Sequence, residues 1–327
     1  MKINIQTPGN ILLASLSFAA LLALALPTHA QVYKSWAAAT GFSGVPVTEF
    51  HSGLGLVSSA RTSATSPMGG TGIAYGYSWT EVGKLHVLAE TRTDSLSLAV
   101  GSDQNVAFSG RDNTGSFDTS APGFYATAAQ FVVDDLVIPG VGAATISTNM
   151  DLHAILDTTA ATALGNFTSE GGFYIGFTVS QGGAGIGTGS LKVSRNSAGV
   201  TTNTGSGLLP ALGAVTPTIS TLYTTGNFTV AKGVPVKMDW FLSAYGIAFT
   251  NGGNATTAKT DMNSTFSWAT SGPVFNIAGG GTASSAQGGI SNNLFGGGGA
   301  SAPEPTSVAF LMLGSTLVLI KNQRQKA

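Results

Sequence analysis

Few residues of this chain have the types and spacing that catalysis requires. Among the carboxylates, Asp134 and Asp135 follow an apolar run, and Asp151 comes next along the chain. Two carboxyl groups roughly 5 to 10 Å apart in a cleft would suit glycoside hydrolysis. Neighbouring residues of a strand point to opposite faces, so Asp134 and Asp135 can form one acid–base pair only if a β-bulge realigns them. A secreted carbohydrate-active hydrolase therefore stays an alternative, and the sequence names no catalytic residue.

Other motifs for catalysis or cofactor binding are missing. The sequence has no Gly-x-Ser-x-Gly elbow, no His-Glu-x-x-His, no Walker loop and no Gly-x-Gly-x-x-Gly fingerprint. It has no cysteine, and the spacing of His51, His86 and His153 does not suggest a metal site. We therefore expect a protein that is not an enzyme and has no resident cofactor.

One turn-like segment carries oxygen ligands. Asp112, Asn113 and Asp118 surround a glycine turn, and calcium prefers carboxylate and amide oxygens as ligands. Their spacing departs from that of the EF-hand loop. Two interpretations stay open: an ordinary turn, which we expect, and a calcium loop in a calcium-dependent adhesion module.

Aromatic residues predict a binding surface. Tyr75 and Tyr77 lie beside glycines on one face of an expected strand. Trp79 follows Tyr77 by two residues, so it lies on the same face. Flat aromatic rings can stack on sugar rings, while neighbouring hydroxyl and amide groups bind sugar hydroxyls. Trp240 alternates with Val236 and Met238 instead, which favours a place in the core. Tyr75, Tyr77 and Trp79 are thus the candidate carbohydrate-binding residues.

Alternating apolar residues predict the strands that position these side chains. The clearest runs of period two lie at 85–89, 96–100, 173–179 and 236–242. Further strands are expected at 72–79, 126–138, 191–194, 223–230, 245–250 and 264–268. Clusters of Gly, Pro, Asn and Asp separate them. Ten or more short strands predict an all-β body, an antiparallel β-sandwich of jelly-roll-like type. A Gly-rich β-solenoid is the alternative, although the sequence shows no solenoid-type repeat.

Two segments give different predictions. Residues 149–164 could form a helix, since Leu152, Ile155 and Leu156 partly fit a helical stripe, although the pair Thr158-Thr159 weakens that interpretation. The glycine-rich segment 181–189 is predicted to be a long flexible loop within the body.

Composition limits the class of partner. Charged residues make up 9% of the chain, against about 25% in typical soluble proteins. The chain has 15 acidic and 14 basic residues. Leaving out Glu304 and the terminal Lys2, Lys321, Arg324 and Lys326 gives the body a net charge of −4. No basic patch remains to neutralise phosphates, which argues against nucleic acid as a partner.

The first thirty residues have the order of parts of a signal peptide. Lys2 precedes the apolar run Ile11–Leu26, and Thr28-His29-Ala30 places small residues where a signal peptidase cleaves. We expect residues 1–30 to be removed between Ala30 and Gln31, with an uncleaved anchor helix as the alternative.

The other end predicts a short membrane helix. A Gly/Ser-rich tether at 279–302 separates the body, 31–278, from an uncharged apolar run at 306–320 and a basic tail at 321–327. At about 1.5 Å per residue, the run spans roughly 22 Å, less than the ~30 Å hydrocarbon core. The basic tail would compensate by reaching the cytoplasmic headgroups. A buried C-terminal core helix is the alternative.

The motif Pro303-Glu304-Pro305, followed by this apolar run and by Lys321 and Arg324, resembles the PEP-CTERM sorting segment of Gram-negative export proteins. The resemblance covers under a tenth of the chain. It implies processing by exosortase and transient insertion in the inner membrane, and family members are associated with exopolysaccharide-producing, biofilm-forming bacteria. The segment Asp261–Asn276 is also loosely similar to the last strands of β-rich proteins that carry such segments.

These observations predict a protein exported through the inner membrane to the cell envelope, the cell surface or the extracellular matrix. We expect a structural or polysaccharide-associated role, with exopolysaccharide or further copies of the chain as partners. The hydrolase and the calcium-dependent adhesion module are the alternatives.

Overall fold

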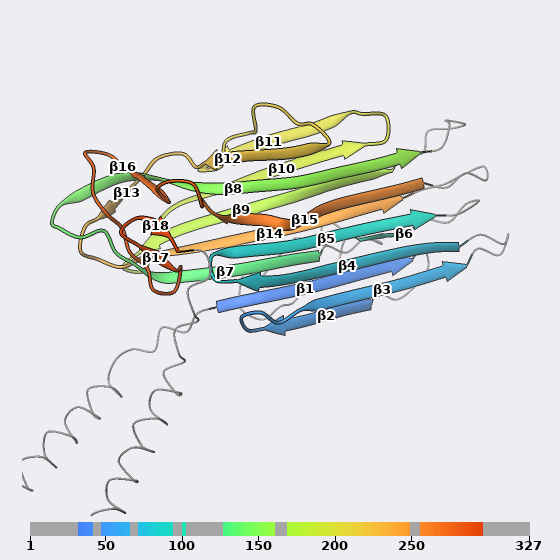
Figure 1. Cartoon of the computed structure of the whole chain (residues 1–327), viewed down its shortest axis with the longest axis horizontal. Coiled ribbons are helices and arrows are strands. Elements are labelled where there is room, and N and C mark those ends of the chain that lie inside the picture. The colour runs from blue at the N-terminus through green and yellow to red at the C-terminus, as the bar shows by residue number, and fades with distance from the viewer. Residues whose placement is uncertain are drawn as a thin grey trace, which may run out of the picture. The chain divides into compact units, whose positions relative to one another are not determined.

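The structure, a computed structural model, describes residues 32–41, 47–65, 71–93, 100–102, 127–160, 169–248 and 256–296. Within these ranges the chain forms β-strands and turns, and every pairing between the named strands is antiparallel. The predicted all-β class is confirmed (Figure 1). None of the described segments forms a helix long and apolar enough to cross a membrane.

The first sheet, called sheet 1 below, has eight strands. Their order is β11-β10-β9-β14-β6-β1-β2, and β7 pairs with both β14 and β1. The strands are β1 (Val32–Gly41), β2 (Val47–Ser52), β6 (Val100–Ser102), β7 (Thr127–Leu136), β9 (Glu170–Gln181), β10 (Ala184–Asn196), β11 (Thr201–Gly207) and β14 (Val236–Ala248).

The second sheet, sheet 2, has the order β12-β8-β15-β5-β4-β3, with β13 and β16 also pairing with β8. Its strands are β3 (Ser58–Thr65), β4 (Thr71–Glu81), β5 (Lys84–Thr93), β8 (Ala143–Ala160), β12 (Thr218–Thr224), β13 (Phe228–Ala231), β15 (Thr256–Trp268) and β16 (Phe275–Ile277). A short hairpin of β17 (Ile290–Ser291) and β18 (Leu294–Phe295) follows.

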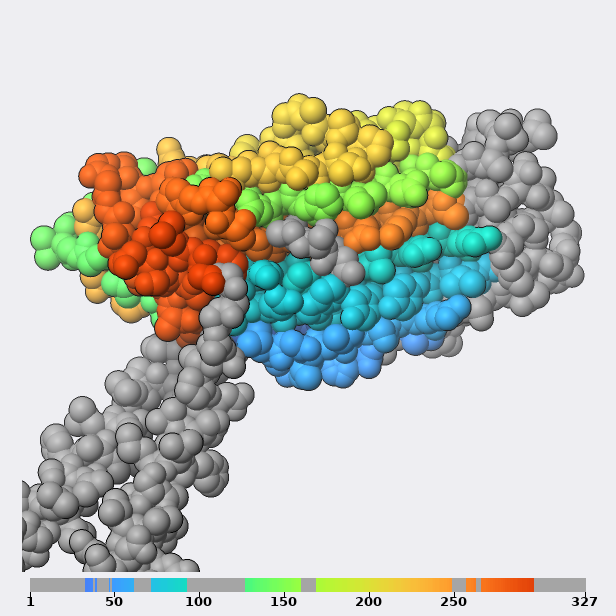
Figure 2. Space-filling model, viewed as in Figure 1, coloured from blue at the N-terminus to red at the C-terminus, as the bar shows by residue number. Residues whose placement is uncertain are grey.

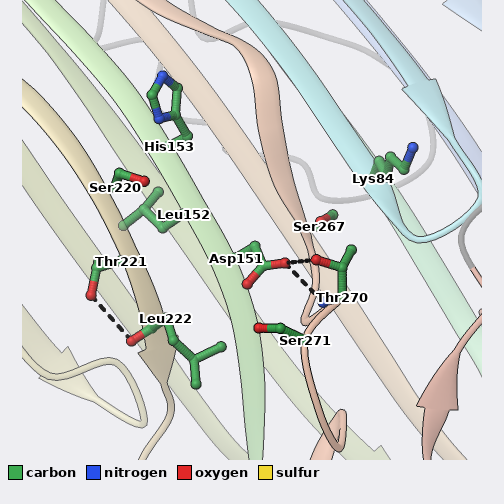
Figure 3. A pocket seen from close by; sticks show the side chains of 10 residues that line it. All are labelled: Lys84, Asp151, Leu152, His153, Ser220, Thr221, Leu222, Ser267, Thr270 and Ser271. Atoms are coloured by element: carbon green, nitrogen blue, oxygen red, sulfur yellow. Dashed lines mark hydrogen bonds between the residues drawn. The ribbon is translucent and has the colours of Figure 1, made fainter.

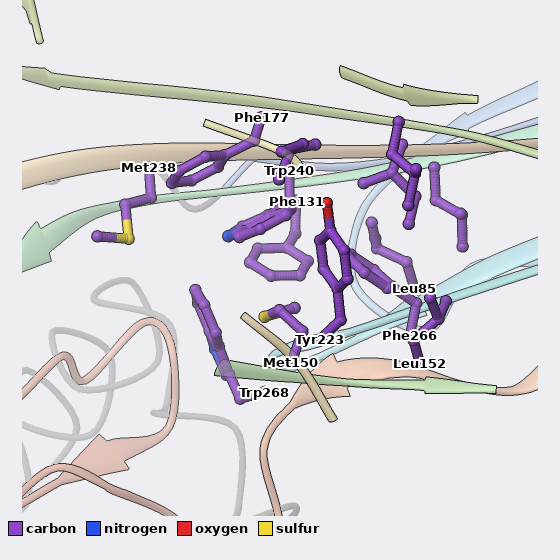
Figure 4. Packing of buried hydrophobic residues seen from close by; sticks show 14 of the residues in the cluster. Leu85, Phe131, Met150, Leu152, Phe177, Tyr223, Met238, Trp240, Phe266 and Trp268 are labelled. Carbon is purple, nitrogen blue, oxygen red and sulfur yellow. The ribbon is translucent and has the colours of Figure 1, made fainter. Parts of the chain in front are cut away.

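The two sheets enclose one main core, as a sandwich does. Trp240 of β14 stacks on Phe177 of β9 with ring centroids 4.1 Å apart, and its edge meets Phe266 and Trp268 of β15 (Figure 4). Phe131 of β7 packs against Trp268 at 5.3 Å. All five side chains are fully buried. The prediction that Trp240 lies in the core is confirmed.

The period-two runs predicted these strands because inward and outward residues alternate along them. Phe173, Ile175, Phe177 and Val179 all point inward from β9. The segments 85–89 and 236–242 are likewise strands, in β5 and β14. The expected strand at 223–230 is instead two strands, β12 and β13, because residues 225–227 leave the sheet between them.

The helix considered for 149–164 is wrong over its described part, where β8 is an 18-residue strand. Met150, Leu152, Ala154 and Leu156 alternate inward, and all four are buried. Ile155 lies on the outward side of this alternation, and its apolar character produced the apparent helical stripe.

The flexible loop predicted for 181–189 is also wrong. β9 and β10 are joined by a two-residue turn, Gly182-Gly183, and residues 184–189 belong to β10. Both glycines have positive φ, +59° and +83°. A turn of this kind matches the twist of antiparallel strands and needs residues that accept positive φ, so these glycines mark a tight hairpin.

The segment 279–296, predicted to be the start of a tether, is folded onto the sandwich in the structure (Figure 2, red). Ala283 and Ile290 are buried in the main core. Val137, just beyond β7, exchanges two backbone hydrogen bonds with Ser284. Of the predicted tether, residues 297–302 lie outside the described residues, as do the signal peptide and the sorting segment 303–327.

Candidate ligand-binding face

The outer face of sheet 2 carries the predicted aromatic residues. Along β4, the inward positions hold small residues, among them Ala74, Gly76 and Ser78, which are buried. The large side chains Tyr75, Tyr77 and Trp79 occupy the alternate positions and are half-buried. The strand therefore turns its bulky aromatic residues away from the core.

These three rings form a continuous strip along β4. Tyr75 and Tyr77 lie 6.2 Å apart, centroid to centroid, with planes 19° from parallel, and Tyr77 meets Trp79 edge-on at 5.1 Å. His86 of β5 stacks on Trp79 at 4.0 Å and 2°. We call these four residues the aromatic strip. Because His86 covers one face of Trp79, the rings do not make one flat platform, and the two tyrosines are its most parallel part.

Charged side chains cross the sheet in a row beside Tyr75. Arg61 of β3 and Glu90 of β5 are its cross-strand neighbours on either side. Glu90 is opposite Lys259 of β15, which is opposite Asp157 of β8. Positive and negative residues thus alternate across four strands. Burial and the neighbouring Tyr77 and Glu90 raise the pKa of the Tyr75 hydroxyl. Like an ordinary tyrosine, it is protonated at neutral pH and can donate a hydrogen bond.

Lys259 has a third anionic neighbour, which lies on its own strand. Its Nζ lies 3.0 Å from Oδ2 of Asp261. This hydrogen bond, together with the negative charges of Asp261, Glu90 and Asp157, raises the Lys259 pKa against the opposing effect of burial. The lysine is therefore a fixed positive charge among carboxylates.

The far end of the strip is a polar cluster at the β4–β5 turn. Lys84 Nζ is 3.1 Å from Oε2 of Glu81, and Nε2 of His86 is 3.8 Å from Oε1 of the same carboxylate. Partial burial opposes ionisation of Glu81, but hydrogen bonds from Lys84 and Trp79 and the charges of Lys84 and His86 outweigh it and lower the Glu81 pKa. Glu81 therefore stays an anion to a lower pH than an ordinary glutamate does.

A hollow of about 640 Å³ opens on the same face, toward β8 and β12 (Figure 3). Lys84, Asp151, His153, Ser220 and Thr270 are among its polar residues. Asp151 accepts hydrogen bonds from the backbone N–H and the hydroxyl of Thr270, at 2.8 and 2.6 Å. Its carboxylate thus holds the turn after β15, while Lys84 belongs both to the hollow and to the end of the strip.

The structure places Asp134 and Asp135 at a β-bulge. Leu136 pairs with Val236 and Val133 with Met238, so these two aspartates together oppose the single residue Lys237 of β14. The β-bulge that an acid–base pair of Asp134 and Asp135 would require is therefore present.

Both carboxylates bind Gln287 of the C-terminal segment. Its side-chain amide donates to Asp134 at 2.7 Å, and its backbone N–H donates to Asp135 at 3.0 Å. The hydroxyls of Ser285 and Tyr33 bond to Asp135 and to the carbonyl of Gln287, respectively. We call these five residues the C-terminal clamp, and its geometry gives the aspartates a structural role.

Burial and the Asp135 charge raise the Tyr33 pKa well above its ordinary value. The hydroxyl therefore stays protonated and keeps its hydrogen bond to the Gln287 carbonyl, which adds to the contacts that hold the C-terminal segment.

The calcium candidates Asp112, Asn113 and Asp118 lie outside the described residues. Within the described ranges, no group of three or more His, Asp or Glu side chains is arranged to hold a metal ion.

Sequence reasoning missed His86 as part of the aromatic strip because the pairing of Trp79 with His86 depends on the register between β4 and β5. The two-residue turn Val82-Gly83 was the signal that could have fixed that register.

Comparison with known proteins identifies no family for this chain. No family model matches the chain, and no curated protein matches it.

Proposed function

We propose that this chain is an exported, non-enzymatic protein of the cell surface or extracellular matrix that binds polysaccharide through the outer face of sheet 2. The observation that carries the proposal is the part of the aromatic strip that lies on β4, Tyr75, Tyr77 and Trp79. These large rings are directed outward from a strand whose inward positions are small, so they contribute little to the main core and leave partly exposed apolar surface. Sugar rings present apolar faces of the kind that stack on aromatic rings.

The surroundings of the strip supply partners for sugar hydroxyls. Arg61 and Glu90 flank Tyr75, and a guanidinium and a carboxylate can donate to and accept from hydroxyl groups. The charged residues of this face come in pairs of opposite sign, such as Lys84 with Glu81 and Lys259 with Asp261. A face with balanced charge suits an uncharged glycan chain better than a polyanion, which would need an excess of positive charge.

A binding experiment tests the proposal. The protein isolated from producing cells is incubated with that organism's purified exopolysaccharide and, as a defined uncharged glycan, with cellulose. We expect saturable binding to at least one of them, at least tenfold weaker for Tyr75→Ala and for Tyr77→Ala. Binding that both variants retain, or no binding with either polysaccharide, would contradict the proposal.

The matched control is Tyr174→Ala. Tyr174 is also half-buried and belongs to an aromatic cluster, but it lies on β9 in the other sheet, 6.1 Å from Phe241. This variant should bind like the unchanged protein. Loss of binding in the control as well would indicate a general loss of structure.

Export is the second part of the proposal and rests on the sequence of both ends. We propose removal of residues 1–30 and recognition of Pro303-Glu304-Pro305 by exosortase, with 306–320 as a transient membrane helix and Lys321 and Arg324 at its cytoplasmic end. Replacing the Pro-Glu-Pro motif by three alanines should leave a larger, membrane-retained form on a gel. Unchanged processing would rule out recognition of this motif.

A further inference from the structure

The hollow on the outer face of sheet 2 lies where side chains change length across four strands (Figure 3). The strand register places Lys84 of β5 opposite Ser267 of β15, and Ser267 opposite Asp151 of β8. Asp151 is in turn opposite Leu222 of β12. Ser267 is fully buried, because its short side chain lies between two longer ones. The surface therefore dips at β15, and the pairing of the strands fixes this dip.

A β-bulge lies between the hollow and the aromatic strip. Residues 263–265 of β15 stand opposite the single residue His86 of β5. On the other side of β15, Thr265 pairs with His153 of β8, which lines the hollow. Bulges are over-represented beside active sites, where they interrupt the regular ladder and redirect side chains. The regular outer face of sheet 2 is thus interrupted where the strip ends and the hollow begins.

The hollow offers polar groups that the fold itself does not use. His153 makes no hydrogen bond with any residue in the described part of the chain. Asp151 bonds to Thr270 through Oδ2, and its Oδ1 accepts no hydrogen bond from the described residues. Ser220 and Ser271 add exposed hydroxyl groups. Imidazole and hydroxyl groups donate and accept, and a carboxylate oxygen accepts, which suits the hydroxyl groups of a sugar.

The charges around the hollow favour an uncharged ligand. The Nζ atom of Lys84 lies 3.1 Å from the carboxylate of Glu81, and Asp151 adds a further negative charge. An acidic sugar would need an excess of positive charge, which these residues do not supply. Leu222, 51% exposed, adds apolar surface against which the C–H groups of a sugar ring can be buried. The lining therefore fits a neutral sugar unit.

The hollow and the two tyrosines of the strip lie too far apart for a single sugar ring. Tyr77 precedes Glu81, the cross-strand partner of Lys84, by four residues, which is about 13 Å along β4. Asp151 lies two strands beyond Lys84, about 10 Å across the sheet. A ligand that touches both regions must therefore be a chain of several sugar units.

From this arrangement we propose that the hollow is a second sugar subsite. It binds one unit of the uncharged glycan chain whose other units stack on Tyr75 and Tyr77, and His153 and Asp151 bond to the hydroxyl groups of that unit. The inference rests on the proposed function, because it extends the same binding face. It adds that the protein distinguishes long chains from short ones, since only a chain that reaches both regions gains from both contacts.

Fragments of different length test the second subsite. The protein isolated from producing cells is titrated with cellobiose and cellohexaose, and with short and long fragments of that organism's exopolysaccharide. Isothermal titration calorimetry measures each Kd. For at least one of the two glycans, we expect the long fragment to bind at least about tenfold more tightly than the short one, because the second contact forms within the complex. Equal affinities would overturn the inference.

Variants of the hollow show where that gain arises. His153→Leu keeps a side chain of similar size and removes both ring nitrogens, so the long fragment should bind about tenfold more weakly and the short one as before. Ser220→Val is a second variant, which replaces a hydroxyl by methyl groups and should act in the same way. The matched control is His51→Leu, because His51 is also half-buried but lies on β2 in sheet 1. It should bind both fragments like the unchanged protein.

Tyr75→Ala distinguishes this inference from the proposed function, since it should weaken the binding of long and short fragments alike. Equal melting temperatures would show that all variants are folded. If Tyr75→Ala weakens binding while His153→Leu and Ser220→Val leave the long fragment bound as before, the strip remains a binding site and the second subsite is wrong. If no fragment binds, or if Tyr75→Ala binds every fragment like the unchanged protein, both proposals are wrong.

Discussion

The two halves of the sandwich use aromatic residues in opposite ways. Around β14 and β15 the sheets are separated by large rings, with Trp240, Trp268 and Phe131 fully buried between them. Between β1 and β4 the interior is instead an alanine cluster that includes Ala37 and Ala74. We call these the aromatic half and the alanine half.

In the alanine half, the sheets come close enough for direct hydrogen bonds. The hydroxyl of Ser78 on β4 donates to the backbone carbonyl of Trp36 on β1, at 2.7 Å. The hydroxyl of Ser58 on β3 likewise donates to the carbonyl of Ser35 at 2.9 Å. With no room for rings between the sheets, the large residues of β4 face outward. The thin interior and the outward-facing aromatic strip are therefore two consequences of one strand pattern.

The largest effect is expected in the aromatic half. Trp240→Ala removes a fully buried ring that contacts Phe177, Phe266 and Trp268. We expect a loss of about 3–5 kcal/mol in the free energy of unfolding, the usual cost of such a cavity. Urea denaturation followed by tryptophan fluorescence measures it.

Trp240→Phe is the matched control for that loss. Within the described residues, the indole N–H of Trp240 has no hydrogen-bond partner. Phenylalanine keeps the stacked ring and removes that buried donor, so it should cost much less than alanine. An equal loss in both variants would mean that ring packing does not explain the stability of this half.

The second effect tests the alanine half by overfilling it. Ala74→Leu adds a branched side chain where Ala37, Ala39 and Ala60 leave no space. Overpacking of this kind costs about 1–3 kcal/mol, and thermal unfolding measures it as a lower melting temperature. Ser59→Leu, on the exposed side of β3, is the control and should be nearly neutral. A stable Ala74→Leu variant would show that the sheets can separate here.

Most strands could be predicted from the sequence because inward residues alternate with outward ones. Phe173, Ile175 and Phe177 show this directly on β9, and Tyr75 and Tyr77 were assigned to one face of β4 for the same reason. The rule works where the two faces of a strand have different residue types. It predicts which side chains of one strand share a face. It does not predict which residues of other strands lie next to them.

The errors have a common physical origin in the pairing of distant segments. β8 was ambiguous because the outward Ile155 broke its alternation, and its pairing with β15 and β12 decides its conformation. The bulge at Asp134 and Asp135 depends on register with β14. The folded segment after Gly279 was unpredictable for the same reason, since its partners lie far away along the chain.

The third prediction concerns the C-terminal clamp. Gln287→Ala removes the amide that bonds to Asp134, and the backbone N–H of Asp134 loses its acceptor. We expect a loss of about 1 kcal/mol, the net contribution of such hydrogen bonds, together with faster proteolysis after residue 279. Mass spectrometry of early cleavage products measures the latter. Gln181→Ala serves as control, because Gln181 makes comparable side-chain bonds at the exposed β9–β10 turn.

The smallest effect on stability is expected where the effect on binding is greatest. Tyr77→Ala removes a ring that lies outside the main core and is held mainly by Tyr75 and Trp79. Surface substitutions usually change stability by less than about 0.5 kcal/mol, so the denaturation midpoint should scarcely move while glycan binding falls. A loss comparable with that of Trp240→Ala would mean that the rings of the strip form a second hydrophobic cluster that stabilises the fold. In that case the two halves would still differ in where their rings lie. They would not differ in what the rings do, because both sets of rings would serve stability.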